Sequence, residues 1–582
     1  MPTHPDSHFQ TSGASTSASP VVSPALTARN SLTSTLHDAS EIHFSPRLEQ
    51  EITRDELRIE KYGGDDPHEP PPKTPHQLPP PSDPEDTLDP DLVTWDGPDD
   101  PANPQNWSRR YRWMLTLLCA LLTVNVTFAS SAPTSVVFFV SEEFGVSLEL
   151  CYMITTTFLL GYVVGPLVWG PGSELVGRRL IFVLTLSAYT LLHLGQALAK
   201  DMTTLLVTRF FAGFFAVSPL TNAGGVIVDL WDPVSRGAAT SLFTVCVFLG
   251  PVMGPIVGGY VSQSHLGWRW VFWVMMIFAG ACSLLAFVAL PETYPPVLLA
   301  RKAKRLRKAD PVTNKNLYAE LDRQDWSIVG VLRRTLLRPF HMLALEPILV
   351  LVTIYLSIVY GLLYALFEAL PVIFEVKRGF STAQVGLVFI GVGIGTTIGC
   401  VVNYFASVHY PQLMKTWRGF PPPENRLFGA MIAGPCLVIG CFWLGWTGAY
   451  PSIPWYVPAL ATIMIGLSVS LVFMSFLSYL IDTYLMYSAS AMAANTFIRS
   501  AVAAAFPLFT VQFFEKLGIN WACTLLGLVS LLLAPSPFLF YKYGARIRAS
   551  SKFAPCVDLR IAKELELEAL AAKQKSEAIE KV

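Results

Sequence analysis

Charged residues are scarce in this sequence: aspartate, glutamate, lysine and arginine make up 15% of its 582 residues. A soluble protein carries about 25%, so a fully soluble fold is excluded. The net charge of −1 gives no basic surface for a polyanion, and we expect no nucleic-acid partner. The nine cysteines are scattered without a CxxC or Cys/His spacing, which argues against a disulfide framework and a metal site.

Sequence motifs for nucleotide binding and catalysis are also missing. No GxxxxGK[ST] loop is present, so we expect no ATP-driven step. No nucleophile elbow, zinc motif or redox pair is present, and we expect a protein that is not an enzyme and holds no cofactor. The opening "MPTHPDSHFQTSGASTSASP" lacks an apolar core, which argues against a cleavable signal peptide.

The sequence does contain apolar runs near 20 residues long, and its mean hydropathy is +0.43. Each run is long enough to cross a hydrocarbon core of about 30 Å. We therefore predict an all-α membrane protein with twelve transmembrane helices. The expected spans are 113–133, 149–169, 180–199, 203–228, 238–261, 269–290, 346–371, 382–406, 427–447, 455–481, 489–513 and 519–541.

The long polar gap at 291–345 divides the spans six and six. The N-terminal tail is rich in serine, threonine, proline and acidic residues and cannot bury enough apolar area to fold. The predicted organisation is a disordered tail (1–107), a six-helix bundle (108–290), a central loop (291–345), a second six-helix bundle (346–541) and a C-terminal tail (542–582).

Basic residues mark one side of the predicted bundles. They flank the first span at Arg109 and Arg110, join spans two and three at Arg178 and Arg179, and crowd the central loop in "RKAKRLRK" (301–308). Positive connections stay in the cytosol, so both termini should be cytosolic. The 301–308 run either lies along the anionic leaflet or only fixes the topology.

Three charged residues lie well inside the spans: Arg209, Glu368 and Arg499. An ionised side chain in hydrocarbon costs at least about 2.5 kcal/mol, so each is a functional candidate. The alternative for Arg209 is a structural arginine bound to backbone carbonyls. Asn495 lies one turn before Arg499, which gives either a polar stripe facing a cavity or a hydrogen bond between helices.

Tyr360, Tyr364 and Glu368 are spaced i, i+4, i+8 and so share one helix face. Two phenol rings beside a carboxylate suit aromatic or cationic solutes. The alternative is an aromatic belt near the outer interface.

Glycines form ridges on several spans. Gly250, Gly254 and Gly258 recur every four residues on the fifth span, and the run 391–399 has the same spacing on the eighth. Ridges without side chains let backbones approach closely in a membrane. We expect them to suit two bundles that rock against each other; the alternative is the ordinary close packing of any large bundle.

With these residues, the sequence resembles the major facilitator superfamily, and within it the twelve-span drug:proton antiporter branch of fungal multidrug and polyamine-type transporters. "GPGSELVGRR" (170–179) is similar to the superfamily signature, and "LLVTRFFAGFFA" (205–216) to the fourth-span motif with its arginine. "GPVMGPIVGG" (250–259) is similar to the antiporter motif, which would comprise Gly250, Pro251, Gly254, Pro255, Gly258 and Gly259. The resemblance covers about residues 95–548.

The resemblance implies the fold of that superfamily, with two six-helix bundles built from inverted repeats, and a role for Arg209 in proton coupling. It also implies a cytosolic gate made of Gly170, Glu174, Gly177, Arg178, Arg179, Asp229 and Arg236. Two positions depart from the signature: Glu174 stands where aspartate is usual, and Leu175 replaces a basic residue.

The sequence thus predicts a secondary transporter that exports small organic molecules, such as drugs, toxins or secondary metabolites, by alternating access. A proton gradient drives it, Glu368 exchanges the protons, and Tyr360, Tyr364, Glu368, Asn495 and Arg499 line the substrate cavity. Its partners are protons, the solute and the lipid bilayer, and we expect a monomer in the plasma membrane or the vacuolar membrane. Export of an organic acid or of polyamines, and a membrane sensor that moves no solute, remain alternatives.

Overall fold

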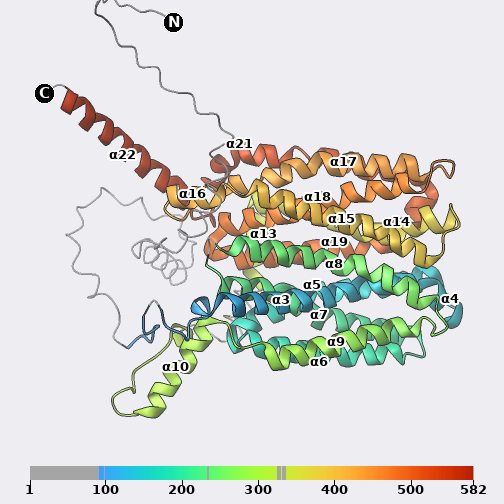
Figure 1. The fold of residues 1–582 in the computed structure, drawn as a ribbon, viewed down its shortest axis with the longest axis horizontal. Helices are drawn as coiled ribbons and strands as arrows, with labels where there is room; N and C mark the ends of the chain where they lie inside the picture. The colour runs from blue at the N-terminus through green and yellow to red at the C-terminus, as the bar shows by residue number, and fades with distance from the viewer. Residues whose placement is uncertain (1–90, 98, 233–234, 324–329, 331–335, 581–582) are drawn as a thin grey trace, which may run out of the picture. The chain divides into compact units, whose positions relative to one another are not determined.

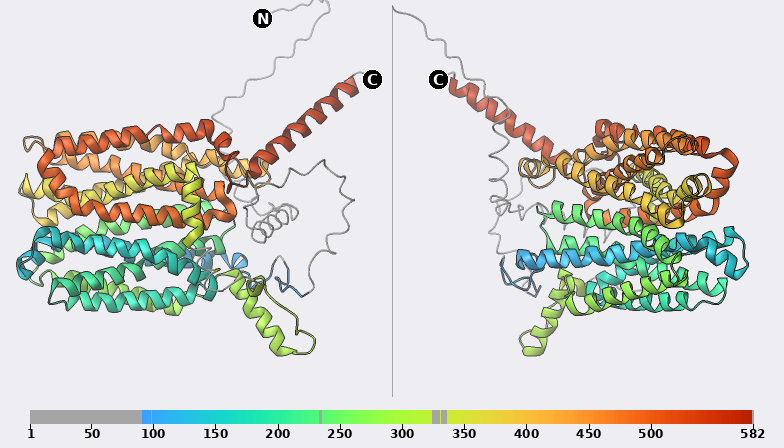
Figure 2. Two further views of the ribbon diagram at one scale, coloured as in Figure 1. Left: turned by 180° about the vertical axis from the view of Figure 1, so that it is seen from behind. Right: turned by 45° about the vertical axis from the view of Figure 1, so that its right-hand side comes forward.

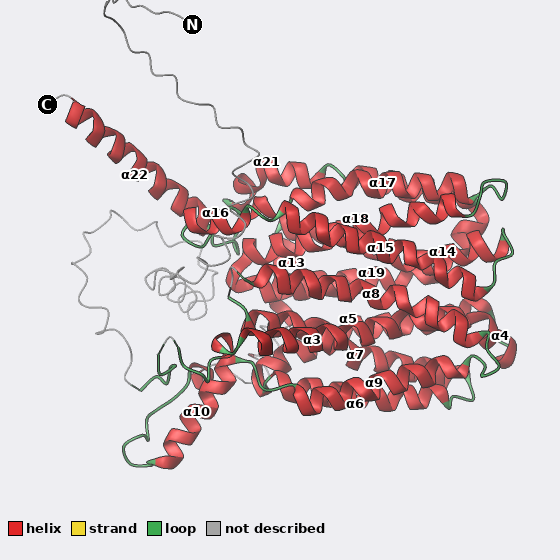
Figure 3. Cartoon of the chain, in the orientation of Figure 1, coloured by secondary structure: helices red, strands yellow, loops and turns green. Residues whose placement is uncertain are grey.

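A computed structural model describes residues 91–580, apart from 98, 233–234, 324–329 and 331–335. Within this described part, the chain forms helices and loops without a strand, apart from one isolated bridge between Leu92 and Tyr318 (Figure 3). Helices satisfy most of their backbone hydrogen bonds internally, as a lipid environment requires. The disorder predicted for residues 1–90 lies outside the described residues.

Twelve helical segments in the described ranges are long and apolar enough to cross a membrane, which confirms the predicted number of spans. The N-terminal half contains α3 (Arg109–Ser131) with α4 (Val137–Phe144), α5 (Leu148–Val176), α6 (Arg178–Ala197), α7 (Met202–Leu230), α8 (Arg236–Ser262) and α9 (Arg269–Ala289). The C-terminal half contains α14 (Pro347–Pro371), α15 (Thr382–Ala406), α17 (Phe428–Gly448), α18 (Tyr456–Tyr484), α19 (Ser488–Leu517), and α20 (Ile519–Leu533) with α21 (Ser536–Arg548).

Each half is a bundle of six spans, and the two bundles lie side by side (Figures 1 and 2). Within the N-terminal bundle α3 packs on α8, α5 on α7, and α6 on α9. Within the C-terminal bundle α14 packs on α19, α15 on α18, and α17 on α20. The bundles meet mainly through α8 against α15 and α5 against α19, where the Thr156 hydroxyl donates to the Ala504 carbonyl at 2.9 Å.

The two ends of the bundles differ. The short helices α13 (Arg338–Leu345) and α16 (Tyr410–Thr416), and the helices α10 (Pro295–Ala309) and α22 (Val557–Glu580), all lie at one end, which we call the tail face (Figure 1). The opposite end, where α4 lies, is the far face. The basic run 301–308 lies in α10 and therefore at the tail face.

Residues 91–107, which the sequence assigns to a disordered tail, adopt defined structure. The Val93 amide donates to the Tyr318 carbonyl at 2.9 Å, and Lys302 of α10 forms an ion pair with Asp96 at 2.6 Å. The folded part of the chain thus begins before the first span, because α10 and residues 317–319 supply partners that sequence composition does not reveal.

The glycine ridges do not lie between the bundles, which corrects the prediction from their spacing. Gly250 and Gly254 face the last turns of α3 in their own bundle, and Gly258 faces the 3-10 turn Ala132–Val136 that follows it: a Cβ on Gly254 would lie 2.7 Å from the Ala132 amide nitrogen. Gly391, Gly395 and Gly399, the ridge of the eighth span, likewise face α18 of the C-terminal bundle, whereas Gly393 between them faces Val252 of α8. The contact between bundles uses other glycines, since a Cβ on Gly259 would lie 2.8 Å from the Thr382 carbonyl oxygen.

Candidate functional site in the interior of the spans

The stripe on α14 predicted from its spacing is buried. Tyr360, Tyr364 and Glu368 are at most 8% exposed, and the rings of the two tyrosines meet with centroids 5.1 Å apart. The Tyr364 hydroxyl donates to the Ser130 hydroxyl of α3 at 3.0 Å. The stripe therefore faces the other bundle rather than an aromatic belt in lipid, and Ser130 is a contact residue that the sequence did not suggest.

Glu368 has no partner among the described residues. Its side chain makes no hydrogen bond or ion pair there, and its Oε1 atom is buried. A carboxylate in this place is costly unless it is neutralised by a proton or a ligand. Glu368 is thus suited to binding and releasing a proton.

Arg499 lies against the same stripe from α19. Its guanidinium carbon is 5.0 Å from the ring centroids of both Tyr360 and Phe473. Its Nη1 donates to the Asn495 side-chain oxygen at 3.4 Å, and the Asn495 amide donates to the Thr353 hydroxyl at 3.2 Å. The predicted hydrogen bond between helices is therefore present, and Asn495 also contacts Arg499; that this stripe faces a cavity stays a prediction.

We call this group of side chains the interior site; its residues are Ser130, Thr353, Tyr360, Tyr364, Glu368, Phe473, Asn495 and Arg499. Phe473 of α18 was not predicted, since a phenylalanine in an apolar run carries no signal of its own. It also contacts Phe248 of α8 at 5.2 Å between ring centroids, so that the N-terminal bundle borders the site twice.

Arg209 is fully buried and bound to the backbone, which is the alternative that the sequence left open. Its Nε donates to the Ile154 carbonyl at 3.1 Å, and Nη1 and Nη2 both donate to the Ala129 carbonyl at 3.1 Å. An α-helix would pair the Ala129 carbonyl with the amide of residue 133. Because Pro133 has no N–H, the arginine satisfies an acceptor that the helix leaves free.

Arg209 is nevertheless connected to the interior site. Its acceptor Ala129 directly precedes Ser130, which accepts the hydrogen bond from Tyr364. The Tyr364 and Tyr360 hydroxyls lie 3.5 Å apart, and Tyr360 contacts Arg499. A continuous row of contacts therefore joins the two buried arginines across the bundles.

The residues predicted for a gate lie at the tail face, and the structure brings only some of them together. Arg178 pairs with Asp229 at 3.4 Å, and its Nη1 donates to the Ser173 hydroxyl at 2.6 Å. Arg179 is exposed and donates to the Phe287 carbonyl at 3.1 Å, and Arg236 donates to the Trp231 carbonyl rather than to Asp229.

The glycines and the glutamate of the gate motif take different places. Gly177 has φ +102°, a conformation that favours glycine, and a Cβ there would collide with the Glu292 carboxylate. A Cβ on Gly170 would meet no atom within 4 Å, and the Glu174 side chain is half-buried.

Glu292, in "LPETY" at the end of the sixth span, is a residue that sequence reasoning missed. Its Oε1 accepts the backbone amides of Arg178 at 2.9 Å, Thr293 at 3.1 Å and Tyr294 at 3.2 Å. Arg301 of α10 lies 3.5 Å from its other oxygen. The signal in the sequence was a carboxylate between a span and a basic run.

The C-terminal bundle carries a matching network at the same face. Arg426 follows the second span of its half and pairs with Asp482 at 2.8 Å at the end of α18, as Arg178 pairs with Asp229 at the end of α7. Beside it, Arg548 binds Glu424 and Asp558. The repeated arrangement ties the span ends of each half together.

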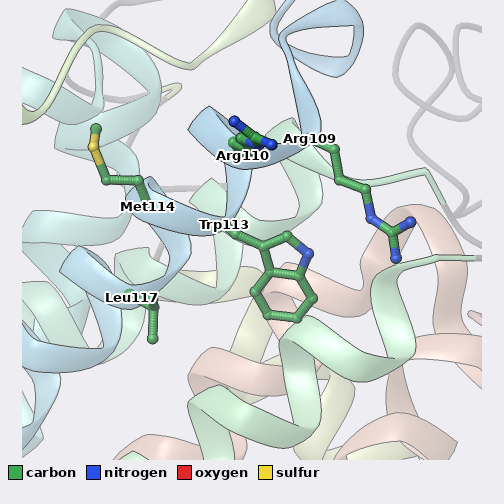
Figure 4. A pocket seen from close by; sticks show the side chains of 5 residues that line it. All are labelled: Arg109, Arg110, Trp113, Met114 and Leu117. Carbon is green, nitrogen blue, oxygen red and sulfur yellow. The ribbon is translucent and has the colours of Figure 1, made fainter.

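A shallow hollow of about 620 Å³ lies elsewhere, on the first turns of α3 (Figure 4). Its lining residues are Arg109, Arg110, Trp113, Met114 and Leu117. Basic and tryptophan side chains at a span end are typical of residues at the membrane–water interface. The hollow is not part of the interior site.

Comparison with known proteins agrees with this architecture. The sequence model of the Major Facilitator Superfamily matches residues 117–507. The chain is 43% identical over 470 residues to an ascochitine biosynthesis cluster MFS transporter of Didymella fabae, covering 80% of this chain and 90% of the relative. It is 40% identical over 494 residues to the multidrug transporter mdrA of Aspergillus fumigatus, covering 84% and 80%.

Solved structures show the same fold at low identity. The xylose transporter XylE from E. coli, in a partially occluded inward open conformation, is 17% identical with a TM-score of 0.51, covering 74% of this chain and 99% of that one. The human organic anion transporter MFSD10 is 16% identical with a TM-score of 0.51, covering 73% and 99%. The chain, with twelve spans in two bundles among its described residues, is a membrane transporter and not an enzyme, and it belongs to the Major Facilitator Superfamily.

Proposed function

We propose that this transporter exports small organic molecules from the cytosol in exchange for protons, by alternating access of the two bundles to the interior site. The observation that carries the proposal is Glu368, a buried carboxyl without a partner among the described residues, one turn from the Tyr364–Ser130 contact between bundles. A group in this place is stable when protonated and costly when ionised, so its proton exchange can accompany a change of access.

The direction and the class of cargo rest on the relatives. The similar proteins of known name include transporters of biosynthesis clusters, an efflux pump of Trichophyton rubrum and a multidrug transporter, which supports export of drugs or secondary metabolites. A proton that moves through about 100 mV gains about 2.3 kcal/mol, which supports a roughly forty-fold concentration ratio of the solute.

The basic residues of the tail face support a cytosolic location for both termini. The basic run in α10 lies at this end. The start of α6 lies beside it, because Arg178 and Arg301 both contact Glu292, and Arg179 follows Arg178. Arg109 and Arg110 begin α3, whose first turn binds the Leu230 carbonyl next to Asp229 through Arg112. Positive connections face the cytosol. We place the protein in the plasma membrane as a monomer, with the vacuolar membrane as the alternative.

The role of Glu368 is tested with the full chain reconstituted in liposomes under an imposed pH gradient, with the neutral 2-naphthamide as the probe. Glu368→Gln should abolish gradient-driven accumulation and leave downhill exchange intact, because the glutamine cannot carry a proton. Glu515→Gln, which removes an exposed carboxyl from α19, is the control and should transport as the wild type does. Undiminished accumulation by Glu368→Gln would exclude this residue as the proton carrier.

A further inference from the structure

The two arginines inside the spans differ in how far their hydrogen-bond donors are used. Arg209 donates hydrogen bonds from Nε, Nη1 and Nη2 to backbone carbonyls. Arg499 makes one long hydrogen bond, from Nη1 to Asn495 at 3.4 Å. Its Nε is buried without a partner, and its Nη2 donates to no described residue. A guanidinium holds its charge at any physiological pH, so Arg499 is a buried cation with free donors.

No carboxylate compensates this charge within the described residues. No ion pair joins Arg499 to an acid, and the nearest glutamate on α14 is Glu368, eight residues beyond the Tyr360 that contacts Arg499. At 1.5 Å per residue, the two levels are about 12 Å apart along the helix. An uncompensated interior cation is expensive unless an anion from outside the chain binds to it.

The surroundings of Arg499 are aromatic. Tyr360 and Phe473 contact each other beside its guanidinium, with their ring centroids 5.6 Å apart, and Phe248 of the other bundle contacts Phe473. Aromatic faces bind planar aromatic solutes by offset or edge-to-face packing. The free Nε and Nη2 form the planar fork that binds a carboxylate with two parallel hydrogen bonds.

From this arrangement we propose that Arg499 is the substrate-recognition residue and that the preferred cargo is a planar aromatic organic acid, whose carboxylate binds Arg499 and whose ring packs beside the Tyr360–Phe473 pair. The proposal rests on the export function proposed above and names its substrate class. It assigns separate tasks to the two charges of the interior site: Arg499 holds the anionic solute, and Glu368, about 12 Å away along α14, carries the proton.

A cationic cargo would use the site differently. An organic ammonium or a polyamine would seek Glu368 and would be repelled by Arg499, which has no acid to screen it among the described residues. The two cargo classes therefore make opposite demands on position 499, and an experiment can separate them.

The test measures binding to the full chain in lipid nanodiscs by intrinsic tryptophan fluorescence, with three probes of one shape: 2-naphthoate, the neutral 2-naphthamide and the cationic 2-naphthylmethylammonium. Wild type should bind 2-naphthoate at least ~10-fold more tightly than either of the others, because a charge-assisted bidentate bond contributes that much. Arg499→Gln should lose this preference, and Arg499→Lys, which keeps the charge without the fork, should retain part of it. Lys516→Gln removes an exposed charge from the same helix and should leave the preference unchanged.

Three results would overturn the proposal: no binding of 2-naphthoate to the wild type, equal binding of the amide or the ammonium probe, or an unchanged preference in Arg499→Gln. Size-exclusion profiles show whether each variant is folded. The comparison of the three probes on the wild type tests the proposal even if a variant does not fold. Gradient-driven transport of 2-naphthamide or of rhodamine 6G by a protein without the carboxylate preference would leave the export function standing. Failure of every probe to move under the gradient would count against the export function itself.

Discussion

Arg548 gives the sharpest prediction of stability. It ends α21 and is 1% exposed, and its guanidinium binds two carboxylates with four hydrogen bonds: Glu424 at 2.9 Å twice and Asp558 at 2.8 Å twice. It thereby joins the last span to the loop before α17 and to the start of α22. Arg548→Gln leaves two buried carboxylates without their cation, which costs about 3–5 kcal/mol when a buried pair is broken.

This loss of stability in Arg548→Gln is large enough to measure by heating the protein in detergent with a thiol-reactive dye. The buried free cysteines Cys441 and Cys523 of the C-terminal bundle report its unfolding when they become accessible. The variant should melt on the order of 10 °C below the wild type. The exposed Arg546, two residues earlier, provides the control: Arg546→Gln should melt within about 2 °C of the wild type.

The reasoning also predicts a rescue. Adding Glu424→Gln and Asp558→Asn to Arg548→Gln removes the unpaired charges and should restore most of the lost stability, because neutral groups cost less to bury. If Arg548→Gln melts at the same temperature as the wild type, solvent reaches the carboxylates of this cluster. A triple variant as unstable as the single one would show that the loss comes from packing and not from charge.

Two further predictions concern the glycine ridge and the N-terminal segment. Gly254→Ala should destabilise the N-terminal bundle by about 1–3 kcal/mol, because its Cβ would lie 2.7 Å from the Ala132 amide, whereas Gly170→Ala, which meets open space, should change stability by less than about 0.5 kcal/mol in the same melting assay. Equal melting of these two variants would contradict the assigned packing. Deletion of residues 2–90 should leave gradient-driven transport in liposomes unchanged, since it keeps the spans and the contact between Val93 and Tyr318; loss of a cellular output with intact transport would favour the sensor alternative.

The number of spans and the buried charges were predictable because both follow from the cost of the membrane. Runs of 20 apolar residues are long enough to cross it. Arg209, Glu368 and Arg499 interrupt such runs, and the free-energy cost of a charge in hydrocarbon marks each as a functional candidate. The shared face of Tyr360 and Tyr364 followed from helical periodicity, and their rings do meet.

The partners of those residues were not predictable, since they come from distant parts of the chain. A ridge of glycines indicates close packing but not which helix fills it, and Gly250 to Gly258 proved to face α3 and the 3-10 turn after it rather than the other bundle. Phe473 has no signal until the fold places it beside Arg499, and the position of Glu292 between a span and a basic run does not reveal that it binds the Arg178 amide. The role of Pro133 could have been inferred, because a proline within a span always frees a carbonyl for a donor such as Arg209.

The central claim is that proton movement through the interior site drives solute export, and simultaneous recording of both fluxes tests it most directly. Liposomes that contain the full chain, a pH-sensitive dye and the neutral 2-naphthamide should show proton and solute fluxes in opposite directions, and both should stop when a protonophore collapses the gradient. Glu368→Gln should show neither coupled flux. Solute accumulation that continues unchanged after the gradient is collapsed would contradict the account.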